Sequence, residues 1–405
     1  MKKNLVWLSL CIAALTTLTA CEMHIDSSSS TNKMMGSGKI ITEQRPVTAF
    51  NAIENNSFFS VIVTGSDKDE VEITGDDNLV PQVETVVEDQ RLIIRNKQKT
   101  YSFSWKNSPG TIKISAAHLQ SVENSGSGDI ELRNVNGDAL TLKSNSSGDI
   151  KASGKLRLLA LVANGSGDLD LEHLSIAQTE VNMNGSGDVH LDTITQSLIV
   201  KVNGSGDFKA SSLQDAAANV MLHGSGSVHL KGRVKDLKVD GSGSGDLEVE
   251  GLKGEQANLN LNGPGEVKLS GEVDALTISV TGSGDVNAKD LHAKKVVLKN
   301  QGPANVYFNI DQDLNAELSG SGDLDAHFNG ANKIELLMNG PGASSFYGTA
   351  DSLSAKVNGS GDLHAHDLLL RTASIKVNGP SEAEVNVKQA SGSRVVKIDR
   401  SGVTN

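Results

Sequence analysis

The chain of 405 residues has almost no cysteine, with only Cys11 and Cys21 present. Cys11 lies in an N-terminal segment that we expect to be removed, so no disulfide is available to the remaining chain. Covalent cross-links therefore contribute nothing to its stability. Packing and hydrogen bonding must hold the fold together.

Aromatic residues make up only 3% of the chain, and basic residues are outnumbered, with a formal net charge of −12. The scarcity of aromatic rings argues against a surface that stacks on sugars. The acidic balance argues against nucleic acid or anionic lipid headgroups as partners, because both require a basic patch. No window has the pattern of a long amphipathic helix.

Long hydrophobic runs are also missing, apart from a short one at the N-terminus. Leu5 to Thr17 is apolar, follows a basic start and is too short to span a bilayer as an ordinary anchor. The next stretch, Leu18-Thr19-Ala20-Cys21, resembles a bacterial lipobox. We therefore predict a lipoprotein signal peptide over 1–21 and lipidation (palmitate) of Cys21, the alternative being a plain signal peptide cut near Ala20.

The segment that follows, 22–38, is rich in serine and glycine and predicts a flexible tether. A lipidated Cys21 would hold the chain to a membrane. Glu22 gives no clear signal for retention in the inner membrane, which favours the outer membrane of a bacterial cell envelope. Whether the chain would face the periplasm or the cell surface stays open.

What the sequence has in abundance is a repeat. The phrase NGSGD, complete at Asn164 to Asp168, returns in strict or looser form at a spacing that is 19 or 20 residues nearly everywhere, in fourteen copies. A fixed period of this size is typical of stacked units that share one core and cannot fold alone.

Residues on both sides of each corner alternate between apolar and polar, as in Val189-His190-Leu191. Period two indicates strands with one buried face. We predict an all-β fold: a single-stranded, right-handed parallel β-helix over 121–390, with about 14 regular coils of 19–20 residues. Each repeat should supply two or three short strands. Rungs ~4.8 Å apart would make a rod of roughly 65–70 Å.

The corner phrase has a physical explanation. Its glycines permit positive φ, and its Asn and Asp side chains can accept hydrogen bonds from turn amides. Before the regular repeats, residues 39–120 read as an N-terminal β portion that also caps the rod, with a short helical turn near Pro81. The strand carrying Tyr101, Phe103 and Trp105 predicts a hydrophobic plug, the alternative being a ligand-contacting patch. The tail, 391–405, predicts a C-terminal cap.

Several motifs together resemble a known family. They are Arg45-Pro46-Val47, Phe50-Asn51-Ala52-Ile53, Phe59 to Val63, Val71 to Leu79 and the NGSGD repeats. The chain resembles the head GIN domain family over roughly 45–390, as more than one family-sized unit in tandem. That family comprises secreted or lipid-anchored bacterial proteins described as auto-transporter adhesins. The resemblance implies a β-helical fold and a cell-envelope location, and it implies no catalytic residues.

Rungs in register would stack the corner acids into a column. Its unbroken part, which we call the Asp column, consists of Asp129, Asp149, Asp168, Asp188 and Asp207. One interpretation is that each carboxylate satisfies backbone amides at its corner. The other is that the column binds Ca²⁺ through carboxylate oxygens. Calcium-binding β-rolls use a nine-residue unit with two facing turns per coil, whereas this chain has one, so the first interpretation is favoured.

A second column is predicted two residues past each corner, and its charges are mixed. We interpret it as a solvated face with no zinc site, because the histidines are scattered and no HExxH or Cys/His cluster accompanies them. It comprises Glu131, Lys151, Asp170, His190, Lys209, His229, Glu248, Lys268, Asn287, Tyr307, Asp325, His364 and Glu384.

These observations favour a non-enzymatic, lipid-anchored envelope scaffold. We expect a monomeric rod without a cofactor, with a protein or glycan on another surface as its ligand. One alternative is a Ca²⁺-binding envelope protein. Another is a polysaccharide-active β-helix enzyme, but such sites need a locally irregular cluster of acids with Arg or Lys. The repeats are regular, with few arginines and no Ser/His/Asp set.

Overall fold

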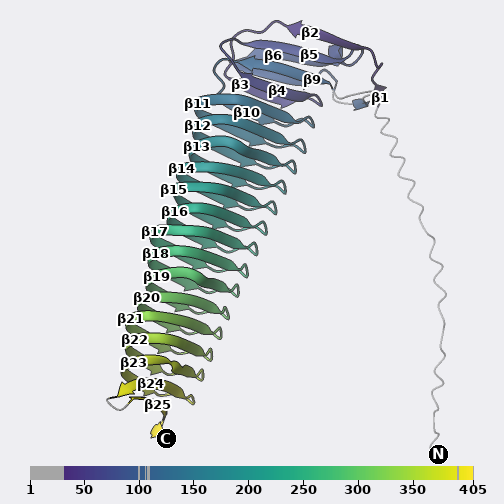
Figure 1. Cartoon of the computed structure of the whole chain (residues 1–405). Helices are drawn as coiled ribbons and strands as arrows, with labels where there is room; N and C mark the ends of the chain where they lie inside the picture. The colour runs from purple at the N-terminus through teal and green to yellow at the C-terminus, as the bar shows by residue number, and fades with distance from the viewer. Residues whose placement is uncertain (1–31, 99–100, 105, 107–109, 390–391, 405) are drawn as a thin grey trace, which may run out of the picture.

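A computed structural model describes residues 32–98, 101–104, 106, 110–389 and 392–404. The chain winds into a rod of stacked coils, with an N-terminal group of strands at one end (Figure 1). The rod is a parallel β-solenoid of about 13 turns, which confirms the predicted architecture. The sequence predicts about 14 regular coils, and its fourteen corners enclose thirteen complete turns.

Each regular coil is one long strand that pairs in parallel with the coil before it and the coil after it. The strands are β11 (Ile130–Ser144), β12 (Ile150–Ala163), β13 (Leu169–Met183), β14 (Val189–Val202), β15 (Phe208–Leu222), β16 (Val228–Gly241), β17 (Leu247–Leu261), β18 (Val267–Val280), β19 (Val286–Asn300), β20 (Val306–Leu318), β21 (Leu324–Met338), β22 (Ser344–Val357) and β23 (Leu363–Val377).

The core is a continuous column of aliphatic side chains inside these coils. In β14, Val189, Leu191 and Ile194 are fully buried, whereas the intervening His190 points outward. Equivalent inward residues of successive coils lie in register, as Val189 does with Leu169 and Phe208. Each fully buried Leu, Val or Ile is worth about 1.5–3 kcal/mol, so stacking supplies the stability that disulfides cannot.

Two details of the coil differ from the sequence prediction. Each repeat forms one strand of 13–15 residues instead of two or three short ones. The strand bends at a second corner, where the ladder register shifts, for example between Leu132 and Val135. Left-handed φ angles occur at this second corner, at Asn134, Gly154 and Gly232 among others. The bulge lets the chain turn without leaving the ladder.

The glycines of the GSGD corner have a different role from the one predicted. None of them has a left-handed φ. Instead, a Cβ on Gly185 would lie 1.9 Å from the carbonyl oxygen of Gly165, and one on Gly204 would lie 1.9 Å from that of Gly185. Corner glycines are therefore required because successive corners stack backbone against backbone.

The N-terminal portion extends the parallel ladders before closing them. Its strands are β2 (Ile40–Arg45), β3 (Ala52–Asn56), β4 (Ser60–Gly65), β5 (Glu70–Asp76), β6 (Val83–Glu88), β7 (Arg91–Asn96), β9 (Thr111–Ala116) and β10 (Ser121–Asn124). One parallel ladder runs from β10 through β3 to β7, and another runs from β11 through β4 to β9.

Antiparallel strands then close this end of the rod. β6 pairs antiparallel with β7, and β5 pairs antiparallel with both β9 and β2. The predicted helical turn is present as a 3-10 turn, η1 (Val80–Gln82). Leu79, Val80 and Val83 are fully buried there and cover the end of the core.

The aromatic plug predicted from Tyr101, Phe103 and Trp105 stays a prediction. β8 (Tyr101–Ser104) pairs in parallel with β1 (Asn32–Met35) in a separate two-stranded sheet. Trp105 lies outside the described residues, as do the side chains of Tyr101 and Phe103.

The prediction of a tether up to residue 38 was too long. Besides the pairing of β1, the Ser37 amide donates to Asn78 Oδ1 at 2.9 Å and the Gly38 amide donates to Asp76 Oδ1 at 2.6 Å. These hydrogen bonds attach the segment from residue 32 onward to the N-terminal strands. The earlier part, 22–31, lies outside the described residues.

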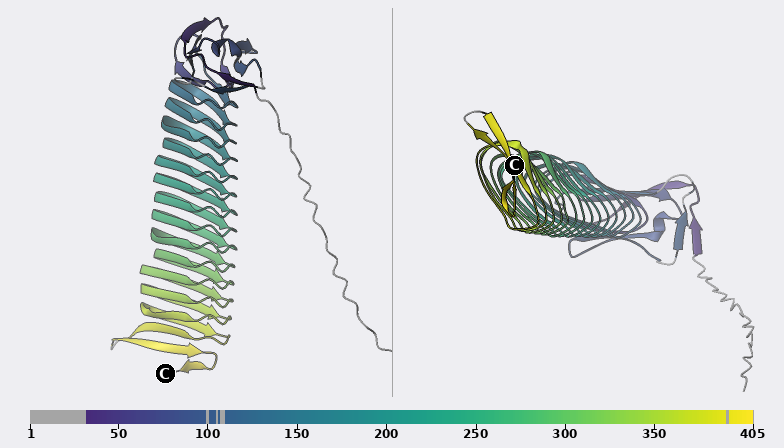
Figure 2. Two further views of the ribbon diagram at one scale, coloured as in Figure 1. Left: turned by 90° about the vertical axis from the view of Figure 1, so that its right-hand side faces the viewer. Right: turned by 90° about the horizontal axis from the view of Figure 1, so that it is seen from below.

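The far end is also closed by antiparallel pairing (Figure 2). β24 (Ala383–Gln389) continues the parallel stack on β23, and β25 (Gly392–Asp399) folds back against it antiparallel. β26 (Gly402–Thr404) then pairs antiparallel with β25. This arrangement agrees with the cap predicted for the charged tail.

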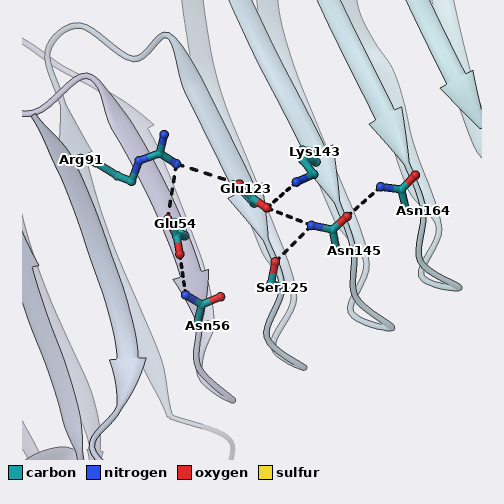
Figure 3. Close-up of polar contacts among 8 residues, drawn as sticks. All are labelled: Glu54, Asn56, Arg91, Glu123, Ser125, Lys143, Asn145 and Asn164. Carbon is teal, nitrogen blue, oxygen red and sulfur yellow. Dashed lines mark hydrogen bonds and ion pairs between the residues drawn. The ribbon is translucent and has the colours of Figure 1, made fainter. Parts of the chain in front are cut away.

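Side-chain contacts join the N-terminal portion to the first coils (Figure 3). Arg91 of β7 contacts Glu54 of β3 at 3.4 Å and Glu123 of β10 at 4.0 Å. Glu123 then contacts Lys143 of β11 at 2.8 Å and accepts from Asn145 Nδ2 at 2.9 Å. The two parts of the chain therefore share one hydrogen-bonded surface.

Candidate functional site

The Asp column exists as the sequence predicted. The backbone amide of each acid donates to the Oδ1 of the acid one coil earlier, at 3.0, 3.0, 2.9 and 2.8 Å from Asp129 to Asp207. This confirms the interpretation that the carboxylates satisfy backbone amides, with one difference: the amide belongs to the next coil. Calcium binding by the column stays a prediction.

A column of asparagines lies beside it at the same corner. The side-chain amide of Asn164 donates to Asn145 Oδ1 at 2.8 Å, Asn184 donates to Asn164 at 2.8 Å, and Asn203 donates to Asn184 at 2.9 Å. Asn339, Asn358 and Asn378 repeat the arrangement near the far end. The corner therefore uses many of its polar groups to join coil to coil, and its first role is structural.

The outward column two residues past each corner also lies in register, as predicted. Lys151 pairs with Asp170 at 3.8 Å, and His229 Nδ1 lies 2.9 Å from Glu248 Oε2. These side chains are one-third to two-thirds exposed, and such pairs contribute only about 0–1 kcal/mol. Within the described part of the chain, one group of three metal-ligating side chains comes together, namely His229, Glu248 and Glu250.

The second corner carries an open groove of about 880 Å³ that spans β15 to β20. We call it the charged groove. Several of its charges come in pairs separated by one residue that faces the core, as Arg233 and Lys235 are separated by the buried Val234. Its lining residues are Asp215, Arg233, Lys235, Lys253, Gly254, Glu255, Glu272, Val273, Asp274, His292, Lys294 and Asp311.

Charge is distributed unevenly along the charged groove. Arg233, Lys235 and Lys253 make the β16–β17 part mainly basic, and Glu272 and Asp274 of β18 make the next part acidic. No aromatic residue lines it. The groove therefore suits a polar ligand that carries charges of both signs.

Ion pairs hold some of these side chains in place. Asp274 Oδ1 lies 2.6 Å from Lys294 Nζ and raises the pKa of that lysine through a hydrogen bond. Arg233 contacts Asp215 at 2.8 Å. Lys235 and Lys253 are exposed on the same surface, so the basic part presents charge to solvent.

The charged groove is not predicted from the sequence, because the repeated NGSGD motif lies at the other corner of the coil. The sequence does contain a pattern that indicates the groove. Four successive repeats carry a charged or ionisable residue at the same position, followed two residues later by another charge. These residues are Arg233, Lys253, Glu272 and His292. The charge-x-charge phrase at a fixed phase places charges on one edge of a solenoid.

Cys21, the predicted lipidation site, lies outside the described residues, and its acylation stays a prediction. In the part of the chain that the structure describes, no helix has the length and apolar character needed to cross a membrane.

The fold and surface together define a class: a long parallel β-solenoid with antiparallel caps and polar, mostly charged faces. A family model described as "Putative auto-transporter adhesin, head GIN domain" matches residues 49–233, 219–330 and 322–398. The chain belongs to this family, which confirms the resemblance noted from its motifs. Three overlapping matches agree with the prediction of several family-sized units in tandem.

Comparison with solved structures finds similar proteins at low identity. One is a "putative adhesin" from Bacteroides fragilis, 16% identical, with 85% of this chain and 99% of that chain covered and a TM-score of 0.23. Another is a "putative adhesin" from Parabacteroides merdae, 18% identical, with 85% and 98% covered and a TM-score of 0.23.

A third is a "Putative lipid binding protein" from Parabacteroides distasonis, 16% identical, with 86% and 98% covered and a TM-score of 0.21. TM-scores this low support no inference about this chain. No curated protein matches it.

Proposed function

We propose that this protein is a non-enzymatic, lipid-anchored rod of a bacterial cell envelope that contacts another surface through its charged groove. The observation that carries the proposal is the groove itself, a concentration of exposed charge on an otherwise regular solenoid. Membership in a family described by its adhesin character supports a surface-interacting role.

A protein is the partner that the groove favours. Basic side chains at Arg233, Lys235 and Lys253 lie beside acidic ones at Glu272 and Asp274, and complementary charge patterns of this kind guide protein association. A glycan is less favoured because aromatic stacking platforms are missing from the lining.

The non-enzymatic part of the proposal is supported by the arrangement of the groove's charges. Two of its carboxylates, Asp215 and Asp274, pair with Arg233 and Lys294 at 2.8 and 2.6 Å, and Asp311 lies 3.6 Å from His292 Nδ1. Enzymes that act on polysaccharides need an acid and a base held on either side of the bond that is cleaved. Ion-paired carboxylates in an open, solvated groove are poorly suited to that task.

Anchoring is tested with Cys21→Ala. The wild-type chain should fractionate with membranes and be labelled by a palmitate analogue, whereas the variant should be soluble and unlabelled. A variant that stays membrane-bound, or a wild type that takes up no label, would contradict the lipid anchor.

Surface binding is tested with the charge reversals Arg233→Glu and Lys253→Glu combined. The purified chain should bind intact envelopes, and the double variant should lose at least about tenfold in affinity because two attractive charges become repulsive. The matched control reverses two lysines of the outward column, Lys151→Glu and Lys209→Glu, and should bind as the wild type does.

Equal binding by the groove variant and the wild type would remove the groove from the proposal. Protease treatment of the envelopes distinguishes the partners: loss of binding indicates a protein, and retention indicates a glycan.

A further inference from the structure

The first two outward residues of β16 and of β17 make a small square on the face of the solenoid. His229 and Lys231 belong to β16, and Glu248 and Glu250 belong to β17. His229 lies in register with Glu248, and Lys231 lies in register with Glu250. All four side chains point away from the core, because Leu230 and Val249 between them are buried.

Three of these side chains converge. His229 Nδ1 lies 2.9 Å from Glu248 Oε2, and His229 Nε2 lies 3.5 Å from Glu250 Oε1. One ligand atom from each residue can be chosen so that the three lie within 4.8 Å of one another. In the described part of the chain no other group of three reaches this proximity.

We propose that His229, Glu248 and Glu250 bind a divalent transition metal ion of the Zn²⁺ class. One imidazole nitrogen and two carboxylate oxygens are a ligand set that Zn²⁺ accepts, with water in the fourth position. Ligand bonds of ~2.0–2.2 Å separate neighbouring donors of a tetrahedron by ~3.3–3.6 Å. One ligand atom from each of the three residues already lies within 4.8 Å of the others, so the side chains must rotate to bring one imidazole nitrogen and both carboxylates to a common ion.

The ladder makes these ligands a preorganised set. The coils β16 and β17 pair in parallel from Val228 to Lys231, directly beneath the four side chains. The exposed fractions of the ligands, 33%, 45% and 37%, leave room for a bound water or a ligand atom from a partner. Calcium is disfavoured because it prefers oxygen ligands only.

Lys231 competes with a bound metal ion for the carboxylate of Glu250. Its Nζ lies 3.0 Å from Glu250 Oε2, and this contact lowers the pKa of the Glu250 carboxyl. The lysine therefore occupies one carboxylate oxygen of Glu250, Oε2, while the other, Oε1, contacts His229. Removing the lysine should therefore strengthen metal binding. If the four side chains served only as structural ion pairs, the same change would lower the stability of the fold and would not strengthen metal binding.

The location gives the site a consequence for recognition. A shallow concave surface of about 510 Å³ lies alongside it, with Lys231 and Glu250 in its lining. Gly232, Gly251 and Gly271 expose backbone there. A bound ion with an open position would add a Lewis acid to the rim of this surface. Metal binding itself does not depend on the function proposed above.

The test uses the full chain in detergent, treated with chelator and titrated with ZnCl₂ by calorimetry. We expect one saturable site per chain. His229→Gln and Glu250→Gln should each weaken it by at least about 100-fold, since changing even outer-shell partners costs 10–100-fold. Lys231→Met should tighten it several-fold. His190→Gln, a change of another outward histidine, is the control and should leave binding unchanged.

Cobalt provides the second readout. Co²⁺ at this site should give the visible absorption of a tetrahedral ion, which His229→Gln abolishes. Thermal melting of the metal-free variants shows whether each is folded. The proposal is overturned if the wild type binds no Zn²⁺, if binding survives His229→Gln in a folded protein, or if Lys231→Met weakens it.

Discussion

The stacked corner glycines make the sharpest prediction about stability. A Cβ added at Gly185 would lie 1.9 Å from the Gly165 carbonyl oxygen, and real Cβ contacts essentially never fall below 3.0 Å. The corner must therefore open by about 1.1 Å. That carbonyl accepts from the amides of Ser186 at 3.1 Å and Gly187 at 3.4 Å, so opening the corner breaks both hydrogen bonds.

Losing two such bonds, at about 0.5–1.5 kcal/mol each, destabilises the rod by roughly 1–3 kcal/mol. The assay is urea unfolding of Gly185→Ala followed by circular dichroism. Gly137 provides a matched control, because nothing lies within 4 Å of an added Cβ and its φ is not left-handed. Gly137→Ala should be neutral or stabilising by about 0.4–1 kcal/mol.

The reasoning would be refuted if Gly185→Ala unfolded at the wild-type midpoint, or if Gly137→Ala cost as much. Either result would mean that successive corners are not stacked backbone on backbone.

Three further predictions concern charged side chains. Asp188→Ala removes the acceptor of the Asp207 amide and should cost about 1–2 kcal/mol in urea unfolding, whereas Asp188→Asn keeps an acceptor and should cost less. Lys397 lowers the pKa of the Glu384 carboxyl, so their attraction is present at neutral pH and is lost as pH falls through that lowered pKa. Lys397→Met should therefore lower the melting temperature at pH 7, and this difference should disappear only as pH falls well below the ordinary glutamate pKa of about 4.3. If the Asp column binds calcium, millimolar Ca²⁺ should raise the melting temperature of the wild type and not of Asp168→Asn; calorimetry without heat and melting without a shift would remove that hypothesis.

Much of the fold could be predicted because the same pattern of alternating residues and glycine corners recurs in every repeat. Alternation around His190 identified the inward and outward residues, and the period of 19–20 identified the coil. Fourteen phrases at one spacing also fixed which residues share a column, including the Asp column. These features are local or periodic, so they need no knowledge of distant contacts.

The caps were predicted less well because they are not periodic. Antiparallel pairing of β5 with β9 and β2, and burial of Leu79 and Val80, depend on segments far apart in the chain.

By itself, the sequence determined a parallel solenoid, its core residues and the alignment of its corners. Each repeat has one apolar face, and stacking the repeats in register is the simplest way to bury all of these faces. The tertiary structure decided why the corners require glycine, since that reason is the distance between two backbones in different coils. It also decided that Glu250 joins His229 and Glu248, and that six repeats contribute to one charged groove. The groove depends on the bend at the second corner, where the ladder register shifts and sequence spacing no longer gives position in space.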